Sequence, residues 1–330
     1  MTIKQTVNTG VAPVFNPEEG KTIIEPLGNE KGYWAGAPTI LYDEENKTFY
    51  LYYRLRQPRG HGENERGFEV RIAKSNDGEN FETIWKLHKK ELNSSSIERS
   101  SLVKVNEDLF RLYISYVDPE NNKWRIDVVE AKHPSLFDVS NRKNVLNSSN
   151  DFGLKNIEGV KDPYIFKKND TYFMYFVYAQ ATDQDLTKEM HETGDIHNTG
   201  LAKASTGLAV SEDGINFKWS NTAIPVGNTG WDQYQSRLTT IIPFNNGYTA
   251  FWDGSVGVEQ NYEEKAATGI TYDLKTFAKV SFDGPVLETY KQKSVRYIDA
   301  LIYENAIWYY YEYTREDEAH ELRLAKVHLK

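Results

Sequence analysis

The sequence has no cysteine among its 330 residues. Disulfide bonds and thiolate chemistry are therefore excluded, which agrees with a reducing compartment. The sequence also has no stretch approaching the roughly 20 apolar residues of a membrane-spanning helix, and its first ten residues lack the apolar core of a signal peptide. We therefore expect a cytoplasmic protein with no membrane partner; a secreted chain whose signal has been removed is the alternative.

Positive charge is scarce as well, because 39 Lys and Arg stand against 48 Asp and Glu, a net charge of −9. Binding to nucleic acid needs a basic stripe and the sequence has none, so we expect no nucleic-acid partner. The 7 histidines show no metal-binding spacing, so neither a metal nor another cofactor is predicted. His191 and His197 lie in an acidic insertion at residues 179–205, which we interpret as a lid over a pocket rather than as a metal site.

Aromatic residues, in contrast, are abundant: 22 Tyr, 15 Phe and 7 Trp favour β-sheets. They occur in a unit that recurs five times, in which a short apolar strand is followed by an aromatic-rich strand and then by a third strand. Repeats of this length are typical of arrays and propellers. The first strands lie 62 to 75 residues apart and begin near Ala37, Ser100, Asp162, Arg237 and Asp299.

The repeat predicts an all-β fold, a five-bladed β-propeller with four-stranded antiparallel blades. We place the blades at about residues 33–90, 94–147, 157–226, 229–287 and 291–330 of a single domain that covers residues 1–330. The last unit ends after its third strand. An N-terminal strand around residues 11–15 is therefore expected to complete it and close the ring. An open pair of β-sandwiches is the alternative fold.

The loops predict which face of the propeller is functional. The sequence Ser-x-Asp-Gly-x-Asn-Phe at residues 75–81 and 211–217 predicts tight turns after two of the third strands, because Asp-Gly readily adopts positive φ. Long loops at residues 54–68, 179–205 and 253–267 separate second from third strands. All three would emerge where the innermost strands begin. Binding residues often lie on loops held by a rigid scaffold, so this face is predicted to carry the site.

Charged residues gather where the innermost strands begin, and these strands converge on the axis of a propeller. Buried carboxylates need a ligand or mutual pairing, so this place is either a polar site for a hydroxylated ligand or a structural ion-pair network. The arginine-rich loop at residues 54–66 either grips a carboxylate, sulfate or phosphate on the ligand or is simply solvated. The predicted catalytic residues are Glu98, Asp162 and Asp299, and the predicted substrate-binding residues are Trp34, Arg66, Arg99, Lys161, Gln235, Arg237 and Trp252.

Two segments resemble glycoside hydrolases. Residues 160–166, Val-Lys-Asp-Pro-Tyr-Ile-Phe, and the aromatic strand from Thr171 are similar to the Asp-Pro-x-x-Phe motif and following strand of family 43. Residues 51–54, Leu-Tyr-Tyr-Arg, with residues 71–78 resemble a strand pair of family 130. The resemblance covers nearly the whole chain. It implies the five-bladed propeller of families 43, 32 and 130, with a carbohydrate site on its axis.

The resemblance is only partial at the catalytic positions. Family 43 has a general-base Asp in the first blade, an Asp that tunes the acid in the third, and a general-acid Glu in the fourth. Asp162 matches the tuning position, whereas Ala37 stands at the base position and residues 235–237 contain no carboxylate. Of the family 130 motif Glu-Asp-Pro-Arg, residues 98–101 keep only Glu98. The resemblance thus implies either a relocated acid and base, Asp162 with Glu98 or Asp299, or sugar binding without cleavage.

We therefore predict a carbohydrate-active enzyme, a glycoside hydrolase that cleaves a glycosidic bond with paired carboxylates in the central funnel. The expected partner is an oligosaccharide or glycoside, with an anionic one among the options, and no oligomeric state is predicted. Two alternatives stay open: a glycoside phosphorylase that uses inorganic phosphate, and a non-catalytic sugar-binding propeller.

Overall fold

The computed structural model describes residues 10–182 and 188–329, and the regular structure there consists of β-strands and short 3₁₀-helices. The all-β prediction is confirmed. None of the helices in these ranges is long and apolar enough to cross a membrane. The 3₁₀-helices are η1 (Pro17–Glu19), η2 (Gly62–Asn64), η3 (Lys89–Leu92), η4 (Pro134–Leu136), η5 (Val139–Asn141), η6 (Lys188–His191), η7 (Ile196–Asn198) and η8 (Val258–Gln260).

The strands form antiparallel groups, which we number in chain order. Group 1 contains β2 (Trp34–Asp43), β3 (Thr48–Gln57), β4 (Arg66–Ser75) and β5 (Glu82–His88). Group 2 contains β6 (Ser101–Asn106), β7 (Leu109–Val117), β8 (Trp124–Ala131) and β9 (Lys143–Leu146). Group 3 contains β10 (Ile157–Lys168), β11 (Thr171–Ala181), β12 (Ala202–Ser211) and β13 (Lys218–Ile224).

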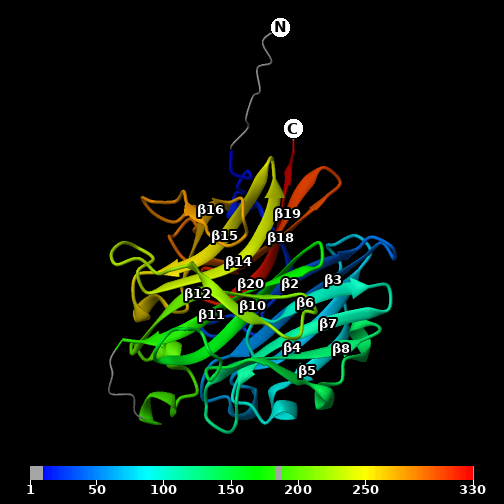
Figure 1. The fold of residues 1–330 in the computed structure, drawn as a ribbon. Helices are drawn as coiled ribbons and strands as arrows, with labels where there is room; N and C mark the ends of the chain where they lie inside the picture. The colour runs from blue at the N-terminus through cyan, green and yellow to red at the C-terminus, as the bar shows by residue number, and fades with distance from the viewer. Residues whose placement is uncertain (1–9, 183–187, 330) are drawn as a thin grey trace.

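Group 4 contains β14 (Gln235–Phe244), β15 (Gly247–Ser255), β16 (Lys265–Thr271) and β17 (Ala278–Lys279). Group 5 contains β18 (Val295–Tyr303), β19 (Ala306–Thr314) and β20 (His320–His328), and its fourth strand is β1 (Lys21–Ile24). A single parallel pair joins β20 to β2, and another joins β12 to β14. Figure 1 shows the red strands of group 5 between the yellow strands of group 4 and the blue strands of group 1.

The N-terminal strand lies later in the chain than the sequence analysis placed it. Lys21 of β1 stands opposite Leu324 of β20, whereas residues 11–15, which the structure describes, form no strand. Pro13 lacks the N–H that a strand would use, and its carbonyl oxygen accepts a hydrogen bond from Tyr309 Oη at 2.6 Å. Phe15 packs its ring at 4.7 Å from that of Tyr309. Residues 11–15 are therefore held by side-chain packing, and β1 supplies the backbone pairing.

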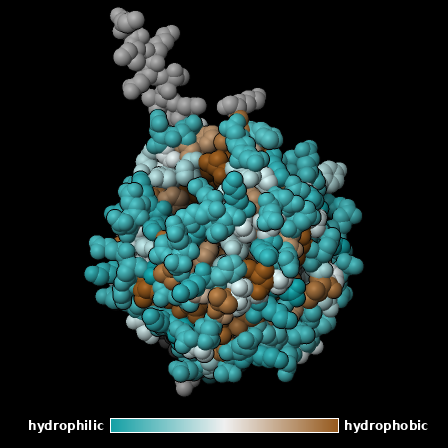
Figure 2. Space-filling model, turned by 90° about the vertical axis from the view of Figure 1, so that its right-hand side faces the viewer, coloured by the Kyte–Doolittle hydropathy of each residue, from teal (hydrophilic) through white to brown (hydrophobic). Residues whose placement is uncertain are grey.

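The innermost strands contact one another in a closed cycle: β2 with β6, β6 with β10, β10 with β14, β14 with β18, and β18 with β2. Apolar clusters fill the spaces between neighbouring groups. For example, Met174 of group 3 packs with Ile126 of group 2, and Tyr309 of group 5 packs with Phe251 of group 4. Figure 2 shows mostly hydrophilic side chains on one face, with hydrophobic ones in small scattered groups. The aromatic second strands thus bury their side chains between sheets, as their composition predicts.

A one-residue bulge interrupts the pairing of each innermost strand with its neighbour. In β2, β10 and β18 the register shifts between Gly36 and Thr39, Lys161 and Tyr164, and Arg296 and Asp299. In each of these three strands, the first residue of the bulge has a left-handed backbone conformation, with φ of 52° at Ala37, 54° at Asp162 and 50° at Tyr297. Non-glycine residues seldom adopt this conformation, and bulges often re-aim side chains next to functional sites.

Beyond the bulges, side chains of the innermost strands accept hydrogen bonds from the backbone of the next group. Asp299 is one of these side chains, so its carboxylate fastens group 5 to group 1. Such bonds between neighbouring groups hold the cycle together near its axis. They run from Ile40 N to Asp299 Oδ2 at 2.9 Å, Ile165 N to Ser101 Oγ at 3.1 Å, Ile241 N to Tyr164 Oη at 3.0 Å and Ala300 N to Thr240 Oγ1 at 3.3 Å.

The two Ser-x-Asp-Gly-x-Asn-Phe turns also fasten neighbouring groups. In the first turn the Asp77 carboxylate accepts hydrogen bonds from the backbone N–H of Glu79 and Asn80, both at 2.8 Å. The turn then presents the Gly78 carbonyl oxygen to Tyr310 Oη of group 5 at 2.8 Å. The second turn repeats this arrangement, because the Gly214 carbonyl oxygen accepts from Tyr113 Oη of group 2 at 2.7 Å. In group 4, the turn after β16 presents the Leu274 carbonyl oxygen to Tyr175 Oη of group 3 at 2.6 Å.

Replacing Tyr113 with phenylalanine is expected to lower the free energy of unfolding by about 1 kcal/mol, because the buried Gly214 carbonyl oxygen loses this donor while the ring packing is retained. Urea denaturation measures the change. Tyr290→Phe is the control, since Tyr290 is 87% exposed. Equal losses in the two variants would show that the hydroxyl of Tyr113 does not stabilise the contact between the groups.

Candidate functional site

A small polar cavity, with room for about one water molecule, lies where the innermost strands begin. Four of its lining residues, Trp34, Glu98, Lys161 and Arg237, are among those predicted from the sequence. No set of three or more Asp, Glu or His side chains in the described ranges is arranged to hold a metal ion. The other lining residues come from the second strand β3, the innermost strand β18 and the loops between strands: Arg54, Arg296, Tyr297, Asp195, Asn261, Tyr262 and Glu264.

The bulges explain why charged side chains from distant parts of the chain meet here. Regular pairing with the second strand resumes at Ser101 in group 2, Tyr164 in group 3, Thr240 in group 4 and Asp299 in group 5. The residues three positions earlier are Glu98, Lys161, Arg237 and Arg296. They therefore occupy equivalent positions in groups 2 to 5, and all four line the cavity. The equivalent residue in group 1 is Gly36.

Gly36 leaves room for a carboxylate from the neighbouring group. A Cβ atom at this position would lie 1.9 Å from Glu312 Oε2. The same oxygen accepts a hydrogen bond from Ala37 N at 3.0 Å. Glu312, on β19, thus takes the place that a group 1 side chain would otherwise fill.

Arg296 joins two buried carboxylates. Its Nη1 is 2.5 Å from Glu264 Oε2, and its Nη2 is 2.6 Å from Glu312 Oε1. Glu312 also pairs with His320 Nδ1 at 2.7 Å, and the His320 ring stacks on Trp34 with centroids 4.6 Å apart. Trp34 therefore lines the cavity with one ring face already in contact with protein.

Arg237 lies at the centre of the cluster. Its Nη2 is 2.8 Å from Asp253 Oδ2, and its Nη1 is 3.4 Å from both Asp162 Oδ2 and Glu264 Oε1. The guanidinium group also lies 3.7 Å from the centroid of the Tyr297 ring, within the range of a cation–π contact. The Tyr297 Oη is 3.4 Å from Asp162 Oδ2. Asp162 is thus adjacent to two lining residues, and its Oδ1 has no hydrogen-bond partner in the part of the chain that is described.

Glu98 pairs with two arginines of β3. It contacts Arg54 Nη1 directly, and its Oε1 is 3.6 Å from Arg56 Nη1. Arg54 Nη2 in turn lies 3.6 Å from Glu312 Oε2. Of the arginines at residues 54–66, the two that contact Glu98 therefore lie at the end of strand β3.

Burial and neighbouring charges move the pKa values of these carboxyl groups in opposite directions. Burial acts to raise the pKa of Glu312, but Arg296, His320 and Arg54 outweigh it and hold this pKa well below its usual range. For Glu264, burial is likewise outweighed by Arg237 and Arg296, so its pKa is lowered. Burial raises the pKa of Asp253 to about 6, with Arg237 opposing the shift. The cluster therefore holds both ionised carboxylates and one carboxyl that protonates near neutral pH.

The insertion between β11 and β12 contributes Asp195 to the cavity wall. Arg66 of β4 holds this segment, because its Nη1 donates to the Thr193 carbonyl oxygen at 2.9 Å and its Nη2 to that of Gly194 at 3.0 Å. Its Nη2 also lies 3.6 Å from Asp195 Oδ2. Arg66 thus positions the insertion and does not itself line the cavity. Residues 183–187, part of the predicted lid, lie outside the described residues.

Four other predicted site residues do not line the cavity. Asp299 accepts from Ile40 N, as described above, and lies 3.8 Å from Arg99 Nη2. Arg99 Nη2 also donates to the Thr239 carbonyl oxygen at 2.7 Å. Trp252 is 1% exposed and packs in the apolar cluster between groups 3 and 4. Gln235 lies just beneath the wall and donates from Nε2 to Glu264 Oε1 at 2.9 Å.

The sequence analysis missed several of the charged residues. Glu312 had a visible signal, since it is the only charged residue in the aromatic run from Trp308 to Tyr313. Asp253 follows Trp252 directly in strand β15. Glu264 and Asp195 lie in long loops and carry no comparable signal. Charged residues within otherwise apolar second strands are therefore worth searching for in repeats of this kind.

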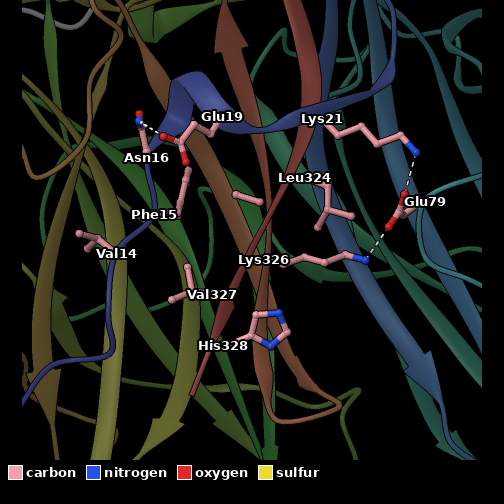
Figure 3. Close-up of a pocket in the computed structure, with 11 residues that line it drawn as sticks. Val14, Phe15, Asn16, Glu19, Lys21, Glu79, Leu324, Lys326, Val327 and His328 are labelled. Carbon is pink, nitrogen blue, oxygen red and sulfur yellow. Dashed lines mark hydrogen bonds and ion pairs between the residues drawn. The ribbon is translucent and has the colours of Figure 1, made fainter. Parts of the chain in front are cut away.

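A larger pocket, of about 500 Å³, lies at the edge of group 5. Figure 3 shows Lys21 and Lys326 both reaching Glu79, at 2.7 and 2.5 Å. These ion pairs are partly exposed, with Lys21 at 56%. Charged groups that neutralise one another near solvent do not form a reactive centre, so the smaller axial cavity is the better candidate.

Comparison with solved structures identifies proteins of the same fold. No protein-family model and no curated protein matches the sequence. A GH43_1 enzyme from Xanthomonas citri, solved with xylotriose, is similar with a TM-score of 0.61 and 10% identity over 92% of this chain and 90% of that one. A structure from the GH130 family, whose mannoside phosphorylases are reported to include hydrolases of β-1,2-mannosidic linkages, gives a TM-score of 0.64 and 14% identity over 96% and 94%. The chain has the fold of these glycosidases.

A third structure, the β-1,2-mannobiose phosphorylase from Listeria innocua, has a TM-score of 0.59 and 14% identity over 92% of this chain and 94% of that one. The resemblance to families 43 and 130 seen in the sequence is therefore confirmed at the level of the fold. At 10–14% identity the likeness extends no further than the fold.

Proposed function

We propose that the five strand groups are the blades of one β-propeller domain closed by β1. The cycle of contacts among the innermost strands supports this architecture, as do the apolar clusters between neighbouring groups. The antiparallel pairing of β1 with β20 supplies the fourth strand of the last blade. Limited proteolysis that released a stable fragment of two or three groups would contradict a single domain.

We further propose that the chain is a glycoside hydrolase whose active site is the axial cavity. One observation carries this proposal: the buried carboxylates of Glu98, Asp195 and Glu264 face one cavity together with cations and aromatic rings. Glycosidic cleavage needs two carboxyl groups, one to protonate the leaving oxygen and one to activate water or attack the sugar. Glu98 is the first candidate, because Asp299 is engaged between groups 5 and 1. Asp162 or Glu264 is the second.

Hydrolysis is tested by incubating the protein with a panel of nitrophenyl glycosides and oligosaccharides and measuring sugar release without added phosphate. Release that requires the intact cavity residues supports hydrolysis. Sugar binding with no release by any member of the panel would favour the non-catalytic alternative.

Replacing Asp162 with asparagine is expected to reduce turnover by about a hundredfold, within the range for loss of a group that assists proton transfer. Asparagine has the same shape and tolerates the φ of 54° at this position, so the fold is expected to persist. Steady-state kinetics and a thermal melt measure the two effects. Undiminished kcat in a folded variant would remove Asp162 from the mechanism.

Phosphorolysis is a second candidate, because four cations, Arg54, Lys161, Arg237 and Arg296, line the cavity. Clustered arginine and lysine side chains are suited to phosphate. A phosphorylase would release a sugar 1-phosphate only when inorganic phosphate is present. Sugar release that is independent of phosphate excludes this candidate.

A further inference from the structure

We propose that Lys161 binds the carboxylate group of an acidic sugar, so that the glycoside taken by the cavity carries a uronic acid or a similar monoanionic residue. The inference rests on the proposed function, because it names the substrate class of the same cavity. It depends on the surroundings of a single lysine.

Lys161 is buried without a partner. It is 5% exposed and lines the cavity, and no hydrogen bond or ion pair reaches its ammonium group from any residue that the structure describes. Its nearest specific contact is the ring of Trp124, whose centroid lies 5.3 Å from Nζ. Burial lowers the pKa of Lys161, with Asp162 and Asp195 opposing the shift. A buried ammonium group in this state favours a ligand that brings a negative charge.

The other charged residues of the cavity wall are already paired. Arg54 contacts Glu98, Arg296 lies 2.5 Å from Glu264, Arg237 lies 3.4 Å from Glu264, and Asp195 lies 3.6 Å from Arg66. Within the described part of the chain, Lys161 is therefore the charged lining residue without an opposite charge in contact. One negative charge on the ligand would complete the set.

The number of free charges favours a carboxylate over a phosphate. A phosphate group carries about −1.5 to −2 charges at neutral pH, which a single lysine does not balance. The arginines nearby are engaged by glutamates and aspartates. A carboxylate carries one charge, and the hydroxyl groups of the same sugar can contact the remaining polar wall.

The test measures binding by calorimetry for glucuronate and galacturonate against glucose and galactose, with inorganic phosphate as a separate arm. Wild-type protein is expected to bind one uronate at least about tenfold more tightly than its neutral counterpart, as a charge-assisted hydrogen bond would give. Lys161→Met should abolish this preference, whereas Lys161→Arg should keep part of it. Lys168→Met is the matched control, since it removes the same charge from an exposed position at the other end of β10.

Each outcome is decisive. Equal affinity for uronates and neutral sugars overturns the acidic-sugar proposal and leaves the carbohydrate function in place. Phosphate binding that depends on Lys161, without binding of uronates, also overturns it and supports phosphorolysis. Binding of no sugar overturns both this proposal and the proposed function. If Lys161→Met does not fold, the comparison of sugars on wild-type protein decides.

Discussion

Replacing Glu98 with glutamine is expected to reduce turnover of a glycoside substrate by about a hundredfold or more, the effect of losing a catalytic acid or base. Glu98 faces the cavity, and glutamine keeps its size and its ability to accept hydrogen bonds from Arg54. Glutamine leaves the buried charge of Arg54 without its partner, so stability falls as well, and kcat is compared at a temperature where both proteins are folded. Steady-state kinetics, together with the thermal midpoint of the variant, measure both.

Two comparisons make this prediction specific. Glu107→Gln removes an exposed carboxylate just beyond β6 and should leave kcat unchanged. Asp299→Asn should reduce kcat less than Glu98→Gln, because burial already raises the pKa of Asp299 to about 6 and asparagine can still accept from Ile40 N. A larger loss from Asp299→Asn, with the fold intact, would transfer the catalytic role to Asp299.

Replacing Glu312 with glutamine is expected to lower the free energy of unfolding by about 3–5 kcal/mol at neutral pH, the usual cost of removing one partner from a buried ion pair. Glu312 is 1% exposed and is the carboxylate between Arg296 and Arg54, so its loss leaves buried positive charge uncompensated. Urea denaturation gives the difference. Glu318→Gln is the control, because the Glu318 side chain is 51% exposed and its pairing with Lys293 is weak by comparison.

The same variant has a predicted pH dependence. The pKa of Glu312 in the folded protein lies below its ordinary value of 4.5, so its ionised form stabilises the fold. This contribution is fully present above pH 4.5 and is lost as the pH falls toward the folded-state pKa. The stability gap between wild type and Glu312→Gln should therefore narrow below about pH 4.5. A gap that stays constant down to the acid limit of folding would mean that packing, rather than charge, accounts for the loss.

The repeat in the sequence was enough to predict an all-β chain and to place the starts of the innermost strands to within about five residues, because aromatic strands buried between sheets have a recognisable composition. It did not predict which polar side chains share a cavity. The one-residue bulges prevented this prediction, because residues before a bulge and residues three positions later, after it, face different sides of the strand. Lys161 and Arg296 lie before a bulge and line the cavity, whereas Asp299 lies after one and faces the neighbouring group.

Glu312 and Glu264 escaped prediction for a different reason. Neither lies on an innermost strand, although both carboxylates pair with Arg296 of β18. For Glu312 the space is provided by Gly36 in a different repeat, a relation that becomes visible only when the two groups are side by side. Composition along the chain does not encode such a complementarity between repeats.

The pairing of β1 with β20 has a consequence for how the protein is made on the ribosome. Within the described residues, β1 hydrogen-bonds to β20 alone, and these are the first and last strands in the sequence. A nascent chain therefore emerges with β1 unable to pair until β20 has been translated. Contacts between such distant segments form late and slowly. The final strand group is thus expected to be assembled only after β20 has left the ribosome.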